Sequence, residues 1–231
     1  MTVGPSVYWY LTRASGAVSL ILLTAALVIG IAAIGRLRTA GVPRFVVDGV
    51  HRTASLLAVV FLVVHILTAV LDSFAPISLL DAVIPFTGVY RPLWLGLGAL
   101  GFDLLLAVVI TSLMRRRLGH DRWRAVHWMA YACWPVAVLH GFGTGSDVRQ
   151  TWMLAIDVIC IVAVLASIVA RATIGWPDHA RLRVAALGLA SAFALGLVIW
   201  LPGGPLGSHW ARRAGTPASL LGHPAARGAH A

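Results

Sequence analysis

The sequence predicts an all-α protein, a polytopic membrane bundle of six transmembrane helices. Of its 231 residues 59% are hydrophobic and only 11% are charged, whereas soluble domains are about 25% charged. Six long apolar runs follow one another along the chain, and short arginine-bearing segments separate them. Because lipid offers no hydrogen bonds to a polypeptide backbone, runs of this length are expected to cross the bilayer as helices.

The six runs approach or exceed the roughly 20 residues that a bilayer requires. They are residues 9–34, 47–71, 93–114, 124–142, 151–171 and 182–201. The first run has no charged segment before it and no evident cleavage site, so we expect a retained helix and not a signal peptide.

The arginines predict the orientation of the bundle. The connections after the first, third and fifth runs hold most of them: Arg36, Arg38, Arg44, Arg115, Arg116, Arg117, Arg122, Arg124, Arg171, Arg181 and Arg183. By the positive-inside rule these connections are cytoplasmic, and both termini lie outside the plasma membrane. The net charge of +10 is then explained by topology and by lipid headgroups, so no nucleic-acid partner is predicted.

Four histidines occupy mirrored positions in the second and fourth runs. His51 and His65 are 14 residues apart, and His127 and His140 are 13 apart. Since both runs cross from inside to outside, His51 and His127 share one depth, and His65 and His140 share another. Ionisable groups inside a membrane are costly and usually functional. Imidazole is a common axial ligand of haem iron, so we interpret the four as ligands of two stacked haems.

In a regular helix the two histidines of the second run would share one face, whereas those of the fourth run would not. At about 100° per residue, a spacing of 14 leaves His51 and His65 about 40° apart on one face. A spacing of 13 leaves His127 and His140 about 140° apart. Pro135 lies between them and cannot bond the carbonyl of Tyr131, so we expect a kink or local rewinding there that reconciles the faces.

These runs resemble the ferric reductase-like transmembrane domain, which NADPH oxidases and the haem subunit of methionine sulfoxide reductase systems share. The histidine spacing carries the resemblance, together with Trp9-Tyr10-Leu11-Thr12-Arg13-Ala14-Ser15-Gly16 and His140-Gly141-Phe142-Gly143-Thr144-Gly145. It covers roughly residues 8–175 and is nearest to standalone actinobacterial members. The resemblance implies a four-helix core with two b haems, an inner one held by His51 and His127 and an outer one held by His65 and His140.

Three arginines are further candidates for the cofactor site. In the oxidases an arginine of the helix equivalent to the first run stands beside the outer haem, so Arg13 is expected to meet a propionate or the electron acceptor. Snorkelling to lipid headgroups is the alternative. Arg52 and Arg124 adjoin the inner ligands and could pair with propionates, or they are topological arginines.

Asp103 and Asp157, the carboxylates within the spans, could bond Arg13 or a histidine Nδ1, or could deliver protons.

The resemblance implies transmembrane electron transfer, as an oxidoreductase or as a subunit of one. The chain has no G-x-G-x-x-G motif and no flavin or nicotinamide domain, so the donor is expected to be quinol or a separate flavoprotein. The acceptor is expected to be exported: a ferric chelate, oxygen, a flavin-binding partner or a methionine-repair enzyme. Two alternatives stay open, a cytochrome of the b561 or hydrogenase type and a non-redox membrane scaffold or metal transporter.

The expected organisation has four parts. A short exported N-terminus (1–8) precedes the ferric reductase-like domain (9–175). An additional transmembrane helix with its cytoplasmic loop (176–201) and a disordered exported tail (202–231) follow.

Overall fold

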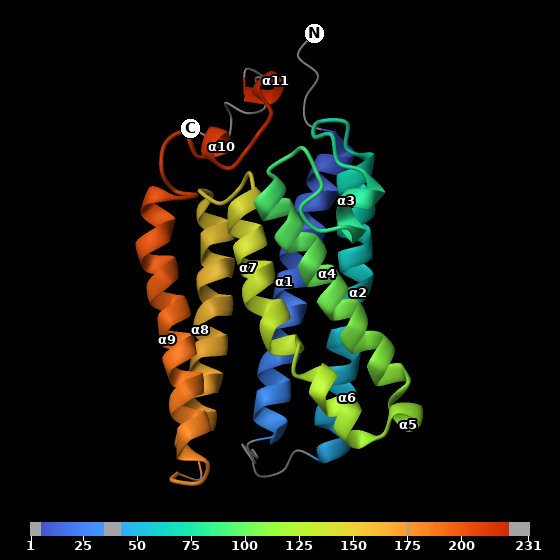
Figure 1. The fold of residues 1–231 in the computed structure, drawn as a ribbon, viewed down its shortest axis with the longest axis vertical. Helices are drawn as coiled ribbons and strands as arrows, with labels where there is room; N and C mark the ends of the chain where they lie inside the picture. Colours follow the sequence, from blue (N-terminus) through green and yellow to red (C-terminus); the bar gives the residue numbers. More distant parts are fainter. Residues whose placement is uncertain (1–5, 35–42, 175, 222–231) are drawn as a thin grey trace.

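A computed structural model describes residues 6–34, 43–174 and 176–221 of the chain. The described residues form helices and connections only, and the helices lie side by side as a bundle (Figure 1). The long helices are α1 (Val7–Ile34), α2 (Arg44–Leu71), α4 (Pro92–Leu113), α8 (Thr151–Thr173) and α9 (Ala180–Gly203). The shorter ones are α3 (Leu79–Val83), α5 (Arg115–Leu118), α6 (His120–His127), α7 (Ala130–Thr144), α10 (Trp210–Arg213) and α11 (Ala218–Leu221).

Five of these helices are long and apolar enough to cross a membrane, namely α1, α2, α4, α8 and α9. Many of their large apolar side chains are exposed, such as Val60, Ile159 and Ile199. A soluble protein would not expose so much apolar surface on every side, whereas lipid is the solvent that this surface suits. The protein is therefore a multi-pass membrane protein with an all-α fold.

The fourth apolar run departs from the expected six continuous spans. Residues 124–142 do not form one helix, because α6 ends at His127 and α7 begins at Ala130. The other five runs form helices whose ends lie within a few residues of the expected boundaries. In Figure 1 α6 and α7 together still run the length of the bundle, beside α4.

The packing order of the helices differs from their order in the chain. The main contacts of α1 are with α2, α8 and α7, while α4 packs on α7 and α9 packs on α8. The apolar core lies between α1, α7, α8 and α9, and it is built from Leu20, Trp134, Val138, Phe142, Cys160, Val164 and Leu197. The Trp134 indole donates to the hydroxyl of Thr24 at 2.9 Å, which satisfies the polar atom of this buried ring.

The segment after α9 is folded onto the bundle, which corrects the expectation of a disordered tail for the described residues 204–221; residues 222–231 lie outside the described part. Trp210 packs on Trp94 and Trp200, with ring centroids 5.3 and 5.7 Å away. Its indole nitrogen also donates to the carbonyl of Gly143 at 3.3 Å. In Figure 1 α10 and α11 lie at the end of the bundle where α1 begins and where α3 is found.

Arg91 ties this segment to the bundle. Its side chain is buried and donates to Thr216 Oγ1 at 2.9 Å and to the carbonyls of Gly143 and Thr144 at 3.0 and 3.1 Å. Its backbone N–H donates to the carbonyl of Gly215 at 3.1 Å. Arg91 has a left-handed φ of 42° directly before Pro92. This conformation is costly for a non-glycine residue and is held by the surrounding bonds.

We predict that Arg91→Ala releases the C-terminal segment. Each hydrogen bond from a charged donor contributes about 1.5–3 kcal/mol, and the population of the open state rises tenfold for about 1.4 kcal/mol lost. Trypsin should therefore cleave the detergent-solubilised variant at Arg212 and Arg213 at least about tenfold faster than the wild type, since loss of a single one of these bonds gives that factor and proteolysis tracks the open population.

Arg116→Ala is the matched control, because Arg116 is an exposed arginine at the opposite end of the bundle. Its cleavage pattern at Arg212 and Arg213 should stay as in the wild type. Equal cleavage rates in Arg91→Ala and wild-type protein would contradict the anchoring role.

Candidate functional site

The four histidines form two facing pairs. His51 and His65 lie on α2, His127 ends α6 and His140 lies on α7. The rings of His51 and His127 have centroids 6.4 Å apart, and those of His65 and His140 have centroids 6.3 Å apart. Because α2 and the α6–α7 segment run in the same direction (Figure 1), each pair lies at its own depth in the bundle.

The break between α6 and α7 turns His127 and His140 to the same side. Around it the backbone makes i→i−3 bonds, from Met129 N–H to the carbonyl of Val126 (2.9 Å) and from Tyr131 N–H to that of Trp128 (3.1 Å). These tighter turns change the angle per residue from that of a regular α-helix. The rewinding thus lies at Trp128 and Met129. This is one to two turns before Pro135, the residue at which the sequence analysis expected it.

Three of the four imidazoles are oriented by backbone carbonyls. Nδ1 of His51 lies 2.9 Å from the carbonyl oxygen of Ala26, and Nδ1 of His65 lies 2.7 Å from that of Thr12. Nδ1 of His140 lies 2.9 Å from the carbonyl oxygen of Trp94. A carbonyl only accepts, so each Nδ1 carries the proton and each Nε2 keeps a free lone pair. This is the arrangement that holds a histidine ready to bind a metal.

His127 is held differently. Its Nδ1 is buried and has no hydrogen-bond partner within the described structure. The ring stacks on Trp123, with centroids 5.0 Å apart and planes 29° apart. The Trp123 indole donates to Ser112 Oγ at 3.2 Å, which connects this stack to α4. The position of the His127 imidazole therefore depends on ring packing and not on a carbonyl.

The spacing within each pair fits two imidazoles that share one metal ion. Two metal–nitrogen bonds of about 2 Å, with about 1 Å from each nitrogen to its ring centre, place the centroids about 6 Å apart. Within the described residues no group of three or more His, Cys, Asp or Glu side chains could hold a metal ion. Two facing imidazoles without further protein ligands suit haem iron, because the porphyrin supplies the other four nitrogens.

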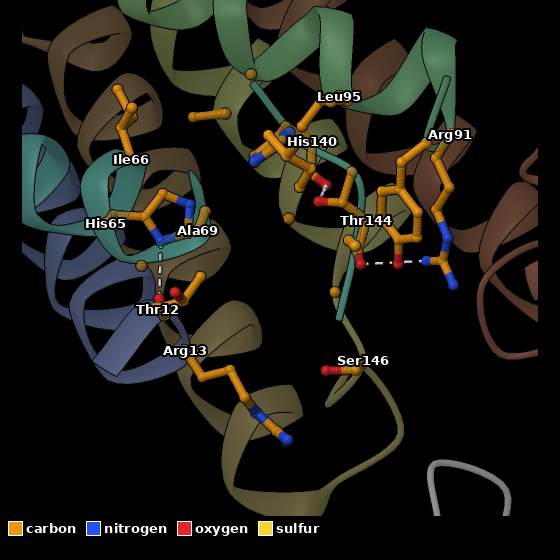
Figure 2. A pocket seen from close by; sticks show the side chains of 18 of the residues that line it. Thr12, Arg13, His65, Ile66, Ala69, Arg91, Leu95, His140, Thr144 and Ser146 are labelled. Carbon is orange, nitrogen blue, oxygen red and sulfur yellow. Dashed lines mark hydrogen bonds between the residues drawn. The ribbon is translucent and has the colours of Figure 1, made fainter. Parts of the chain in front are cut away.

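A cavity of about 380 Å³ surrounds His65 and His140. Figure 2 shows His65 and His140 facing each other across it, with Thr12 and Arg13 on the His65 side and Arg91 and Thr144 on the His140 side. Apolar side chains make up most of the lining, among them Leu62, Ile66, Leu95, Phe102 and Leu105. Trp210 and Leu221 of the C-terminal segment also line it. The cavity therefore combines an apolar surround with a few convergent polar groups, as cofactor sites usually do.

Arg13 lies at this cavity and is paired with Asp147, a residue of the connection between α7 and α8. Its guanidinium also lies over the Trp9 ring, 3.6 Å from the centroid. Asp147 is buried, and its second carboxylate oxygen has no hydrogen-bond partner among the described residues. Arg13 is thus a partly buried cation with an anionic partner, and not an arginine that merely snorkels to headgroups.

The remaining candidates are less integrated into the site. Arg52 and Arg124 are exposed at the arginine-rich end of the bundle. Asp157 is buried on α8, and Asp103 is half-buried on α4. Within the described residues no hydrogen bond or ion pair joins either carboxylate to Arg13 or to a histidine Nδ1, so these expected pairings are wrong. Arg13 pairs with Asp147 instead. The three bonded Nδ1 atoms pair with backbone carbonyls.

Sequence reasoning missed Asp147 and Arg91. Both lie in connections, and the sequence presents them as ordinary loop charges; a buried ion pair or a buried multi-dentate arginine depends on chain segments that are far apart in the sequence. The only signal available was the position of Asp147 shortly after the run 124–142, which contains His140.

The comparison with protein families matches the model described as "Ferric reductase like transmembrane component" to residues 15–143, more than half of the chain. The match includes all four histidines, and it is shorter than the 8–175 range expected from the resemblance. Comparisons with curated proteins and with solved structures gave no match. The chain belongs to the ferric reductase-like transmembrane family.

Proposed function

We propose that the protein carries electrons across the plasma membrane through two b haems, one held by His51 and His127 and the other by His65 and His140. The observation that carries this proposal is the pair of ring separations, 6.4 and 6.3 Å, each matching two imidazoles on one iron. Membership of the ferric reductase-like family supports the same conclusion.

Bound haem iron would supply the one-electron chemistry. The protein's own residues set the conditions for it. The carbonyls of Ala26, Thr12 and Trp94 hold the Nδ1 protons and orient the rings, so that each Nε2 lone pair stays free for a metal ion. The apolar lining around His65 and His140 excludes water and keeps the local dielectric low, which tunes the redox potential.

The direction of transfer follows from the proposed orientation. The end of the bundle with α5 and the start of α6 carries the arginine cluster 115–117 (Figure 1), so we place it in the cytoplasm. Electrons enter there from quinol or from a separate flavoprotein. They leave at the opposite end, where α1 begins and where α10 and α11 lie, to an exported acceptor such as a ferric chelate, oxygen, a flavin-binding partner or a methionine-repair enzyme.

Detergent-purified protein expressed with sufficient haem should show a b-type spectrum with two haems per chain. His65→Ala or His140→Ala should each remove about one haem, and His51→Ala or His127→Ala should each remove the other. His179→Ala is the matched control, because His179 is an exposed histidine directly before α9 and outside both pairs; it should retain both haems.

The absence of a Soret band from the wild-type protein would overturn this proposal and would favour the non-redox scaffold or transporter. If a single His→Ala variant lost haem from both sites equally, the assignment of one histidine pair to each haem would be contradicted.

We further propose that Arg13 presents positive charge to the outer site and that Asp147 holds it there. Both residues line the cavity that contains His65 and His140, and a buried or half-buried charge pair acts over a longer range than one in water. Arg52 and Arg124, which adjoin the inner ligands, are proposed to serve inner propionates from the protein surface.

Removing either charge should shift the midpoint potential of the outer haem in opposite directions. A nearby cation stabilises the reduced state, so Arg13→Ala should lower the potential and Asp147→Asn should raise it. We expect shifts of tens of millivolts, since about 59 mV corresponds to about 1.4 kcal/mol for one electron. Spectroelectrochemical titration of the His51→Ala background, which keeps the outer pair, gives the measurement.

Arg212→Ala is the control, because Arg212 is an exposed arginine on the C-terminal segment at the same end of the bundle. It should leave the outer potential unchanged. Shifts of the same sign in Arg13→Ala and Asp147→Asn would show a general loosening of the site and would contradict an electrostatic role.

A further inference from the structure

Each carbonyl that accepts a histidine Nδ1–H lies four residues before a glycine of the same helix. On α1 Thr12 precedes Gly16 and Ala26 precedes Gly30, and on α4 Trp94 precedes Gly98. The relation holds for all three bonded histidines, on two different helices. His127, whose Nδ1 has no partner within the described structure, is the exception.

Helix geometry gives this spacing a physical meaning. The carbonyl of residue n points towards the N–H of residue n+4, and the Cβ of a helical residue leans back over the turn that precedes it. A side chain at n+4 therefore covers the flank of carbonyl n. Glycine at n+4 leaves that flank open, so a ring from a neighbouring helix can approach the carbonyl as a second donor.

The structure shows that the imidazoles occupy this space. A Cβ placed on Gly98 would lie 2.5 Å from both Nδ1 and Cε1 of His140. One placed on Gly16 would lie 2.9 Å from Nδ1 of His65, and one placed on Gly30 would lie 3.4 Å from Cε1 of His51. The rings cannot move aside freely, since each is also bonded through Nδ1 and faces a second imidazole.

We infer that Gly16, Gly30 and Gly98 are positioning residues of the two histidine pairs: each opens a helix carbonyl to one imidazole and thereby fixes the tautomer and the position of that ring. The inference rests on the proposed function for its haem readouts but not for the geometry itself. It also predicts that His127, without a carbonyl or a glycine, is the least constrained of the four rings.

The first test is haem-independent. In apo-protein, Gly98→Ala should lower the thermal unfolding temperature measured in detergent when His140 is present. It should not lower it in the His140→Ala background, because the ring that the added Cβ would clash with is then absent. Gly16→Ala should show the same dependence on His65→Ala. Such non-additivity is the signature of a direct contact. Equal losses in both backgrounds would mean that the glycines serve general helix packing, and would overturn the inference.

Gly101→Ala is the matched control on α4. Gly101 is buried, yet an added Cβ would meet only Val136 Cγ1 at 3.7 Å, which is ordinary contact. This variant should unfold near the wild-type temperature and should show no coupling to His140. Strong coupling of Gly101→Ala to His140 would contradict the assignment of Gly98 as the specific partner.

The second test uses haem content and low-spin spectra. Gly98→Ala and Gly16→Ala should lower the content from two haems per chain towards one, with loss at the outer site, whereas Gly30→Ala, which has more room, should lose less of the inner haem. Unchanged content and an unchanged low-spin spectrum in Gly98→Ala would overturn the inference. If wild-type protein holds no haem, the proposed function fails, while the apo-protein cycles still decide the role of the glycines.

Discussion

The hydrogen bond between a half-buried imidazole and a helix carbonyl is the interaction on which the rest of this structure depends. An imidazole in an apolar bundle needs a partner for one nitrogen, and the backbone carbonyls of α1 and α4 supply it for His65, His51 and His140. The rings of the two pairs then lie with their centroids 6.4 and 6.3 Å apart. The packing of α1 on α2 and of α4 on α7 meets this requirement, because α1 orients both rings of α2 and α4 orients the His140 ring of α7.

The same requirement accounts for the irregular features of the bundle. A regular helix through the fourth run would turn His127 and His140 to different faces, and the tight turns at Trp128 and Met129 remove that conflict. At the end of the bundle that holds α10, Arg91 and Trp210 both bond the carbonyl of Gly143, close to His140 in the sequence. The C-terminal segment, which the family match does not include, thereby lines the cavity around His65 and His140.

Much of the fold followed from the sequence, because transmembrane helices are governed by local hydrophobicity and length. Five of the six runs formed helices near their expected limits, and the parallel course of the second and fourth runs followed from counting crossings. The expectations that failed concern contacts between distant segments. The tail folds back through Trp210, and Arg13 takes its partner from the connection between α7 and α8. Composition shows that the tail is rich in Gly and Pro. It does not show that Trp210 of this tail can pack on Trp94 and Trp200 of the bundle.

The sequence by itself determined that the protein is a membrane bundle and which four histidines it places at two depths, since both depend on hydrophobic run length and residue spacing. Only the tertiary structure decided which atoms hold those histidines. The carbonyls of Thr12, Ala26 and Trp94 are chemically like every other carbonyl of their helices. They become acceptors because a glycine one turn later leaves their flank open to a ring from another helix, and that relation exists only once the helices are packed.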